Sequence, residues 1–379
     1  MNKLYPIIFT VILLNHMKRV LVGATLSRAK KLPAWSSIYL DMLRIIAALT
    51  VFFYHIYFLR YPNDNVTHIL DKLSHLAVIV FFVISGFVIA YTSSSKISTL
   101  NNYLIVRLSK LFSVVLPALM ITGIIQFILK MYFSNILGPF VKGLSFSHYM
   151  ISGVFCNEIW FYSAAPALNT PLWSLSYEFW YYIIFGLFYY RSGGFKSLVP
   201  GILACVVAGP KILLLMPIWL FGYFAYTLSP RINIKSSVRW IIVFCILLIT
   251  AVLIKVITPV AKLGVYPLVY ANQFSTDWII GFSIALSFCF LPLHSAGVNQ
   301  FFYKAVRAGA ELTFPLYVLH FPLIILWDTV FNTTNEVLNE NLWQVIVGVL
   351  IISCGIGLLL DKYRYLWARL KYRYRIVYH

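Results

Sequence analysis

Apolar runs recur along almost the whole of this chain, and most of them reach the length of about 20 residues that a helix needs to cross a membrane. Hydrophobic residues make up 61% of the 379 residues and charged residues only 11%, whereas a soluble domain carries about 25% charge. We therefore predict an all-α, polytopic transmembrane bundle with about ten spanning helices. The run at 197–209 is short, so we expect a re-entrant segment or one half of a broken helix there. The ten runs are 37–59, 73–92, 104–129, 172–190, 197–209, 211–228, 238–258, 274–293, 312–331 and 342–360.

The basic residues predict the orientation of these helices. The net charge is +19, but the lysines and arginines lie at the ends of the apolar runs and do not form one patch. We therefore expect no nucleic-acid partner. If the N-terminus is inside and ten helices alternate, 23 of the 30 lysines and arginines lie inside and 7 outside. Cytoplasmic loops carry this kind of excess, so we predict that both termini are cytoplasmic.

We divide the chain into three parts. Residues 1–35 are predicted to be an N-terminal cytoplasmic or interfacial extension, or to precede a true start such as Met17. Residues 36–361 form the transmembrane domain. Residues 362–379 form a basic-aromatic cytoplasmic tail, a composition that suits anionic lipid headgroups better than nucleic acid. The five cysteines are irregularly spaced and most lie in apolar runs, so we predict free thiols rather than disulfides or a metal site.

The first run carries a histidine and an arginine on one helix face. Arg44 and His55 are eleven residues apart, which is about 20° beyond three full turns and about 16 Å along the axis. Asp41 lies one turn before Arg44 and can pair with it. Charges inside a spanning helix usually face a cavity or a partner. His55 is therefore a candidate proton acceptor and Arg44 a candidate anion ligand. For either residue alone, a packed histidine or an arginine reaching the headgroups is the simpler explanation.

A pair of cations opens the third run. Arg107 and Lys110 are three residues apart at the end that we predict to be cytoplasmic. Two such cations can hold phosphate groups. The alternative is the ordinary basic flank of a spanning helix.

Two further runs place polar residues inside the predicted membrane, and those of the fourth run lie in its outer half. Ser174 and Glu178 are one turn apart next to Trp173, so Glu178 is a candidate to orient a histidine or to bind an acceptor hydroxyl. A glutamate near the interface is the alternative. On the ninth run, Tyr317 and His320 lie between two prolines, which free backbone carbonyls and require a cavity or a polar partner. A kinked packing helix is the alternative there.

The longest stretch between spans is 131–171, on the predicted outer side. It holds Trp160 together with His148, Asn157, Glu158 and Asn169. Aromatic and amide side chains suit carbohydrate binding, and they suit an aromatic belt at the membrane interface equally well.

These motifs together resemble the membrane-bound acyltransferase 3 family over about 36–360. One departure is Lys110, where the family often has arginine, and another is Met42, where it usually has glycine. Lysine binds phosphate as a point charge without the fork of arginine. The matching segments, in order, are LDMLRIIAALTVFFYH with Arg44 and His55, VFFVISGFVI at 80–89, the pair Arg107 and Lys110 followed by Pro117, PLWSLSYEFWYY at 171–182 and TFPLYVLHFPL at 313–323.

The resemblance implies transfer of an acyl group, commonly acetyl, from cytoplasmic acyl-coenzyme A to a hydroxyl of a cell-surface or exported glycan. Acyl-coenzyme A is then a donor substrate, and no permanently bound cofactor or metal is expected. The other expected partners are a glycan or lipid-linked sugar acceptor and membrane lipids, and the expected location is the bacterial inner membrane. The implied roles are catalysis by His55, Arg44 and Glu178, donor binding by Arg44, Arg107 and Lys110, and acceptor binding by Trp173, Ser174, Tyr317 and His320.

Two functions of another class explain the helices and their intramembrane charges equally well. One is a flippase or transporter for lipid-linked sugars, and the other is a glycan polymerase. Neither explains the ordered motifs. Dependence on acyl-coenzyme A separates the acyltransferase from both.

Overall fold

The computed structural model describes residues 8, 10, 12–14, 32–95, 99–133, 145–258, 262–292, 297–331 and 342–371. Within these ranges the regular structure is helical, apart from one isolated β-bridge between Val265 and Val269. The helices are α2 (Ala34–Arg60), α3 (Asn65–Ser95), α4 (Leu100–Tyr132), α5 (Phe146–Gly153), α6 (Trp173–Tyr189), α7 (Val199–Ala208), α8 (Pro210–Leu228), α9 (Ser236–Val256), α10 (Phe274–Cys289), α11 (Gln300–Phe331) and α12 (Leu342–Lys371), with short 3-10 turns η2 (Ala167–Leu172), η3 (Lys196–Leu198) and η4 (Ser229–Arg231).

Each of the ten apolar runs forms a helix, which confirms the all-α, multi-pass prediction. Seven helices in the described ranges are long and apolar enough to span a membrane. Three helices are shorter: α6 has 17 residues, α7 has 10 and α10 has 16. The count of about ten crossings and the cytoplasmic position of both termini therefore remain predictions. The short run at 197–209 gives only α7, which Gly209 alone separates from α8.

The two termini extend beyond what the structure describes. Helix α2 begins at Ala34, at the end of the predicted extension, and residues 15–31 lie outside the described part of the chain. Helix α12 continues to Lys371, so the first ten residues of the predicted tail prolong the last helix. Residues 372–379 lie outside the described part.

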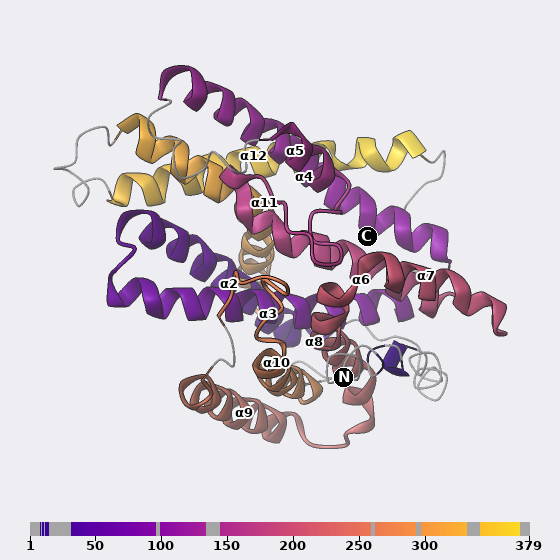
Figure 1. Cartoon of the computed structure of the whole chain (residues 1–379). Coiled ribbons are helices and arrows are strands. Elements are labelled where there is room, and N and C mark those ends of the chain that lie inside the picture. The colour runs from indigo at the N-terminus through magenta and orange to yellow at the C-terminus, as the bar shows by residue number, and fades with distance from the viewer. Residues whose placement is uncertain are drawn as a thin grey trace.

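Helix α3 lies at the centre of the bundle and packs against α2, α8 and α10. Figure 1 shows it between α12 and α4 on one side and α10 and α9 on the other. Two glycines allow α3 and α8 to approach closely. A Cβ on Gly86 would lie 1.9 Å from the carbonyl oxygen of Trp219, and one on Gly222 would lie 2.0 Å from that of Val83. Small residues at helix contacts are typical of membrane bundles.

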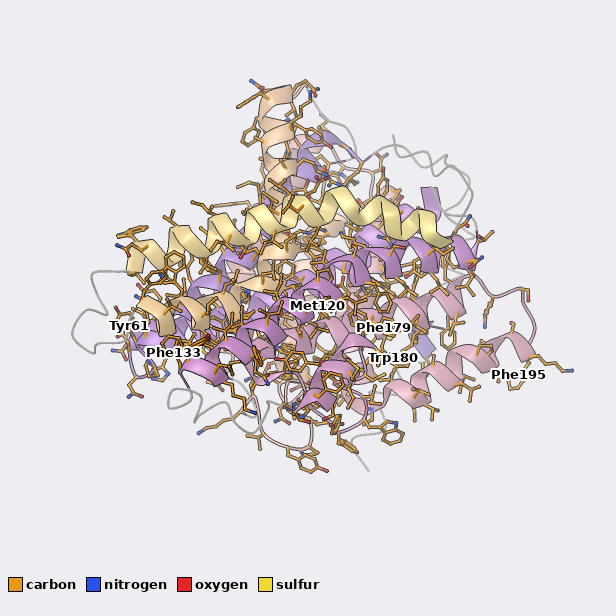
Figure 2. All side chains as sticks on the ribbon, turned by 90° about the horizontal axis from the view of Figure 1, so that it is seen from above. Tyr61, Met120, Phe133, Phe179, Trp180 and Phe195 are labelled. Atoms are coloured by element: carbon orange, nitrogen blue, oxygen red, sulfur yellow. The ribbon has the colours of Figure 1, made fainter. Side chains whose placement is uncertain are left out.

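The outer surface of the bundle is apolar. Helices α9 and α12 bury only 22% and 28% of their most apolar stretches. Met120 on α4 is 70% exposed and Phe195 before α7 is 79% exposed, and Figure 2 shows Phe195 at the edge of the molecule. Contiguous exposed apolar surface of this kind fits contact with lipid.

Candidate active site

Helices α2 and α11 run side by side in the same direction and carry many of the candidate residues. Their polar contacts join residues at nearly constant separations of 266, 265 and 268 in the sequence, which requires parallel helices. Helices α2, α4 and α11 begin at the same end of the bundle. We call this end the basic end. From the basic end outward, the contacts are Asp41 with Arg307, His55 with His320, and Arg60 with Asp328.

The two histidines meet near the middle of this helix pair. His320 Nε2 lies 3.0 Å from His55 Nδ1, and His320 Nδ1 lies 3.0 Å from the carbonyl oxygen of Leu316. A carbonyl only accepts, so His320 donates from Nδ1 and its Nε2 accepts when the ring is neutral. His55 Nδ1 also lies 2.9 Å from the carbonyl oxygen of Val51, so Nδ1 carries the proton. The network therefore leaves the lone pair of neutral His55 on Nε2.

Aromatic rings fix the position of the two imidazoles. Tyr54 and Phe321 each place a ring centroid 4.9 Å from that of His55. The side chain of His320 is buried, with 1% exposed, while His55 is partly exposed. His55 is therefore the histidine that a substrate can reach.

Two of the four residues predicted to bind the acceptor are joined by a hydrogen bond. The hydroxyls of Ser174 and Tyr317 lie 2.7 Å apart, which links α6 to α11. Tyr317 also packs beside His320, with ring centroids 6.0 Å apart. Ser174, Tyr317 and His320 thus form one continuous group that ends at His55.

Trp173 is the fourth residue of that predicted set, and it stacks on a tyrosine from a distant loop. Its ring lies 4.0 Å from the ring of Tyr270, with 8° between the planes. Tyr270 belongs to the segment 262–273, which precedes α10. One face of the indole is therefore covered by Tyr270, and Trp173 is buried.

Glu178 is held by a polar network inside the bundle. Ser85 donates to its Oε1 at 2.9 Å, Tyr182 donates to the same oxygen, and Trp219 Nε1 donates to Ser85 at 3.1 Å. This network joins α3, α6 and α8. In the described part of the chain, the hydrogen bonds of Glu178 go to Ser85 and Tyr182 and not to a histidine.

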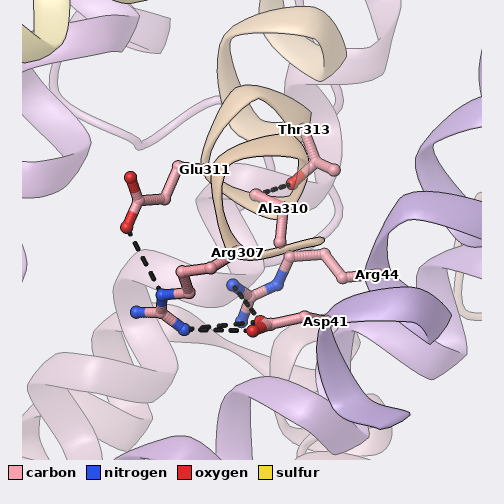
Figure 3. A network of polar contacts seen from close by, with 6 residues as sticks. All are labelled: Asp41, Arg44, Arg307, Ala310, Glu311 and Thr313. Carbon is pink, nitrogen blue, oxygen red and sulfur yellow. Dashed lines mark hydrogen bonds and ion pairs between the residues drawn. The ribbon is translucent and has the colours of Figure 1, made fainter. Parts of the chain in front are cut away.

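Arg44 shares its carboxylate partner with a second arginine. Arg44 Nη1 lies 4.0 Å from Asp41, and Arg307 Nη1 lies 3.3 Å from the same side chain. Figure 3 shows both guanidinium groups directed at Asp41, with Arg307 also reaching Glu311 at 3.4 Å. Arg44 interacts electrostatically with Glu178 as well. It therefore connects the basic end to the network around Glu178.

The two cations of α4 point to different neighbours. Arg107 donates to the hydroxyl of Thr92 on α3 and interacts electrostatically with Tyr182. Lys110 is exposed and lines a cleft with Glu311 of α11. The structure thus brings Arg44 and Arg107 to the same network and places Lys110 apart from them.

The sequence of this chain matches the acyltransferase domain of the acyltransferase 3 family over residues 37–361. The chain belongs to this family. The match covers the whole predicted transmembrane domain apart from its first residue. The resemblance drawn from the ordered motifs is confirmed, and this member of the family has several helices long and apolar enough to span a membrane.

One curated relative of this chain is the acyltransferase MdmB of Streptomyces mycarofaciens. The two are 31% identical over 154 residues, which is 39% of this chain and 38% of the relative. The match spans well under half of either protein, so it defines no acceptor for this chain. No solved structure matches the chain at a significant level.

Four residues of the candidate site were missed in the sequence. Ser85 and Tyr182 lie within two quoted motifs, but only the fold shows that both bond to Glu178. Tyr270 and Arg307 lie outside every motif. In the sequence, Arg307 looks like one of the basic residues that ordinarily flank a spanning helix. Nothing near Tyr270 in the sequence indicates its contact with Trp173.

The stretch 131–171, which we predicted to lie outside, is only partly available to a ligand. Residues 134–144 lie outside the described part of the chain. Asn157, Glu158 and Asn169 are buried, whereas Trp160 is 48% exposed. Asn169 donates to the carbonyl oxygen of Val318, next to Tyr317. Most of these polar groups therefore support the fold.

Glu158 forms a buried ion pair that anchors this stretch. Its Oε2 lies 2.6 Å from Lys211 Nζ, and neither side chain is exposed. Ser163 donates to the other carboxylate oxygen at 2.6 Å. Burial raises the pKa of the Glu158 carboxyl, and Lys211 opposes this rise.

Proposed function

We propose that this acyltransferase moves an acyl group, with acetyl as the first candidate, from cytoplasmic acyl-coenzyme A to a hydroxyl of a cell-surface or exported glycan. We propose His55 as the general base. The contact between His55 and His320 carries this proposal, because it leaves the Nε2 lone pair of a partly exposed imidazole available. A positioned imidazole is the commonest biological base for a hydroxyl.

The proposed reaction is direct transfer. His55 Nε2 accepts the proton of the acceptor hydroxyl while the oxygen attacks the thioester carbonyl. The new carbon–oxygen bond forms, the carbon–sulfur bond breaks, and the proton passes from His55 to the departing thiolate. Nδ1–H of the transient imidazolium donates to His320, which supports the positive charge. The same geometry allows a second route through an acyl group on His55.

We propose that the donor enters at the basic end. Arg44 and Arg107 both interact with the network around Glu178 and Tyr182, so they are the cations best placed to hold its phosphates. From Arg44, an extended pantetheine arm would follow α2 for about 16 Å to His55. Lys110, which we grouped with these arginines in the sequence, faces a separate cleft.

Glu178 and the acceptor-side residues take supporting roles in this proposal. The hydrogen bonds from Ser85 and Tyr182 to Glu178 fix a carboxylate whose negative charge balances Arg44. Glu178 is therefore a positioning residue that acts through Arg44. The hydrogen bond between Tyr317 and Ser174 joins the start of α6 to α11 one turn before His320, and we place the acceptor beside this contact.

The proposed setting is the bacterial inner membrane, with both termini in the cytoplasm and the acceptor as a glycan or a lipid-linked sugar. Membership of an acyltransferase family favours an enzyme over the flippase, transporter and polymerase alternatives. Acyl-coenzyme A should raise the thermal stability of the protein through binding.

The test is transfer of label from radioactive acetyl-coenzyme A to a glycan fraction of the producing cell. Membranes would hold the wild type, His55→Ala or His68→Ala at equal amounts. His68 is an exposed histidine at the start of α3 and serves as the matched control. We expect transfer with the wild type and His68→Ala, and at least a hundredfold loss with His55→Ala.

Two results would overturn the proposal. Wild-type transfer by His55→Ala would remove His55 from the chemistry. Absence of transfer by folded wild type with acetyl, succinyl and longer donors would exclude coenzyme A thioesters as donors.

A further inference from the structure

Three aromatic side chains outside the candidate site form one exposed surface, on two segments that are far apart in the sequence. Trp160 and Phe161 belong to the segment 155–164, and Tyr266 belongs to the segment 262–273. Their exposed fractions are 48%, 39% and 74%. The ring of Phe161 contacts both others, with centroid distances of 6.3 Å to Trp160 and 6.4 Å to Tyr266. We call these three side chains the aromatic platform.

The backbone at Trp160 is held in a strained conformation. Trp160 has a φ of 51°, a left-handed value that bulky residues rarely adopt. Its N–H donates to the carbonyl oxygen of Ala208 at 3.1 Å, and a Cβ on Gly209 would lie 2.6 Å from its Cα. Lys211 donates to the carbonyl oxygen of Tyr162 at 2.7 Å. The start of α8 therefore fixes the direction in which the Trp160 side chain leaves the backbone.

The segment 262–273 is closed by hydrogen bonds of its own around Tyr266. The N–H of Val269 donates to the carbonyl oxygen of Val265 at 2.9 Å, and Asn272 Nδ2 donates to the same oxygen at 2.6 Å. Val269 also has a left-handed φ, of 50°. Strained backbone of this kind persists only where the surrounding structure imposes it, and it clusters at functional sites. Both segments therefore present their exposed rings in fixed positions.

The aromatic platform lies on the side of the bundle away from the basic end. Ser36, at the start of α2, donates to the carbonyl oxygen of Pro292 at 2.7 Å, so α10 ends near the basic end. The segment that precedes α10, and Tyr266 with it, lies toward the opposite end. This is the side on which we place a cell-surface or exported acceptor.

The same segment reaches the candidate site through Tyr270. Tyr270 stacks on Trp173 at 4.0 Å and interacts electrostatically with Tyr317. It comes four residues after Tyr266, a stretch of backbone that spans at most about 14 Å. One oligosaccharide can therefore touch both the aromatic platform and the residues that we propose to bind the acceptor.

Exposed aromatic residues also occur where a membrane protein meets the lipid headgroups. That role requires an amphipathic ring at the right depth and makes no demand on the backbone. The strained backbone of Trp160 and the closed turn around Tyr266 instead fix where each ring lies, which a stacking contact requires. The contact between Tyr270 and Trp173 also joins this surface to the candidate site, which favours a shared ligand over lipid.

We propose that the aromatic platform binds a second sugar residue of the acceptor, so that the acceptor is an oligosaccharide or a longer glycan and not a single sugar. The C–H groups on the face of a sugar ring are slightly positive and pack on the negative face of an aromatic ring. The inference rests on the proposed function, because it extends the acceptor site proposed there.

The experiment measures binding and transfer separately, with the full-length protein in detergent. The probe is the radiolabelled glycan fraction of the producing cell, cut by partial acid hydrolysis and separated into single sugars and oligosaccharides. Binding of each pool is measured by equilibrium dialysis. The double variant Phe161→Leu, Tyr266→Leu keeps apolar side chains for contact with lipid but removes two flat faces. Tyr266→Leu alone changes only the most exposed ring and serves where the double variant melts early.

Two further variants are the controls. Tyr266→Trp keeps a flat face at the same position. Phe301→Leu removes a phenylalanine that is 82% exposed at the start of α11, at the basic end. We expect the leucine variants of the aromatic platform to weaken oligosaccharide binding about tenfold, as loss of stacking contacts implies, and to leave binding of single sugars unchanged. Both controls should bind as the wild type does.

Equal oligosaccharide binding by the wild type and the leucine variants would overturn the proposal and assign these rings to the headgroup interface. Absence of oligosaccharide binding by the folded wild type, or an equal loss for single sugars, would also overturn it. Transfer from acetyl-coenzyme A is measured in the same preparations. Binding that depends on the aromatic platform without any transfer would contradict the proposed reaction alone, whereas transfer to oligosaccharides that is unaffected in the leucine variants would contradict the platform alone.

Discussion

His320 Nε2 lies 3.0 Å from His55 Nδ1, although 265 residues separate the two in the sequence. The contact depends on α2 and α11 running in the same direction. It supports a role for His320 beside the acceptor binding that we predicted from the sequence. We now propose that His320 positions His55 and sets its tautomer.

His320→Ala should lower kcat at least tenfold and leave KM for the donor nearly unchanged, because Nδ1–H of the His55 imidazolium would lose His320 and keep only the carbonyl oxygen of Val51 as acceptor. His320→Gln should recover part of the loss, since the amide oxygen of glutamine can accept from Nδ1–H. The measurement is steady-state acetyl transfer by the two variants at equal folded amounts. Equal losses in both variants would reduce His320 to a packing residue.

The ion pair of Arg60 and Asp328 should keep α2 and α11 aligned, so that His55 and His320 stay in contact. Arg60 Nη2 lies 2.6 Å from Asp328, and the arginine side chain is 1% exposed. Arg60→Met leaves a poorly solvated carboxylate and should cost about 3 kcal/mol of stability. We expect a lower melting temperature together with lower kcat. The double variant Arg60→Met, Asp328→Leu should regain stability, and a melting temperature no higher than that of Arg60→Met would contradict this explanation.

Much of the fold could be predicted from the sequence because membrane helices are specified locally. A run of apolar residues must satisfy its own backbone hydrogen bonds in lipid, so each run became a helix. The number of crossings could not be fixed in the same way. Helices α6, α7 and α10 are shorter than a full span, and their depth depends on their neighbours.

The candidate site was predicted less completely because it depends on contacts between helices. Periodicity placed Arg44 and His55 on one face, but it could not show that Arg307 shares Asp41 with Arg44. Arg107 and Lys110 are one turn apart, yet Arg107 bonds to Thr92 while Lys110 lines a cleft. Spacing along one helix does not determine which neighbour each side chain meets.

Arg107 and Arg44 should contribute mainly to donor binding. We expect Arg107→Ala and Arg44→Ala each to raise KM for acetyl-coenzyme A about tenfold, as loss of a charged hydrogen-bond donor to phosphate implies. Lysine at either position should restore part of the affinity but not the bidentate contact. The measurement is initial rate against donor concentration. An unchanged KM in both alanine variants would locate the phosphates elsewhere, and Arg231→Ala, on the short η4 turn, is the control.

Gly86 and Gly222 should tolerate no side chain. Alanine at either position would place a Cβ about 2 Å from a backbone carbonyl oxygen of the facing helix, so α3 and α8 would have to separate. We expect a loss of at least about 3 kcal/mol, seen as low yield and a lower melting temperature. Gly355→Ala on α12 is the control, because a Cβ there meets nothing within 4 Å. Normal melting of Gly86→Ala would contradict the close contact.

Lys211→Met should destabilise the protein most at neutral pH. Burial raises the pKa of the Glu158 carboxyl above its usual value of 4.5, and Lys211 opposes that rise. Without Lys211 the folded-state pKa rises further, so the folded protein binds more protons than the unfolded chain as the pH rises. Below about pH 4.5 the Glu158 carboxyl is neutral in both states, and the variant loses no stability through this group. As the pH rises toward the folded-state pKa, the carboxyl ionises more readily in the unfolded chain, and the variant loses stability.

The measurement that checks this is thermal melting of the wild type, Lys211→Met and the double variant Glu158→Gln, Lys211→Met at pH 4 and pH 7.5. Removing one partner of a buried pair costs about 3–5 kcal/mol, because it leaves the other charge unpaired. We therefore expect Lys211→Met to melt well below the wild type at pH 7.5 and to recover at pH 4. The double variant carries no charge at either position, so its difference from Lys211→Met should be large at pH 7.5 and small at pH 4. A pH-independent difference would show that Lys211 acts by packing alone.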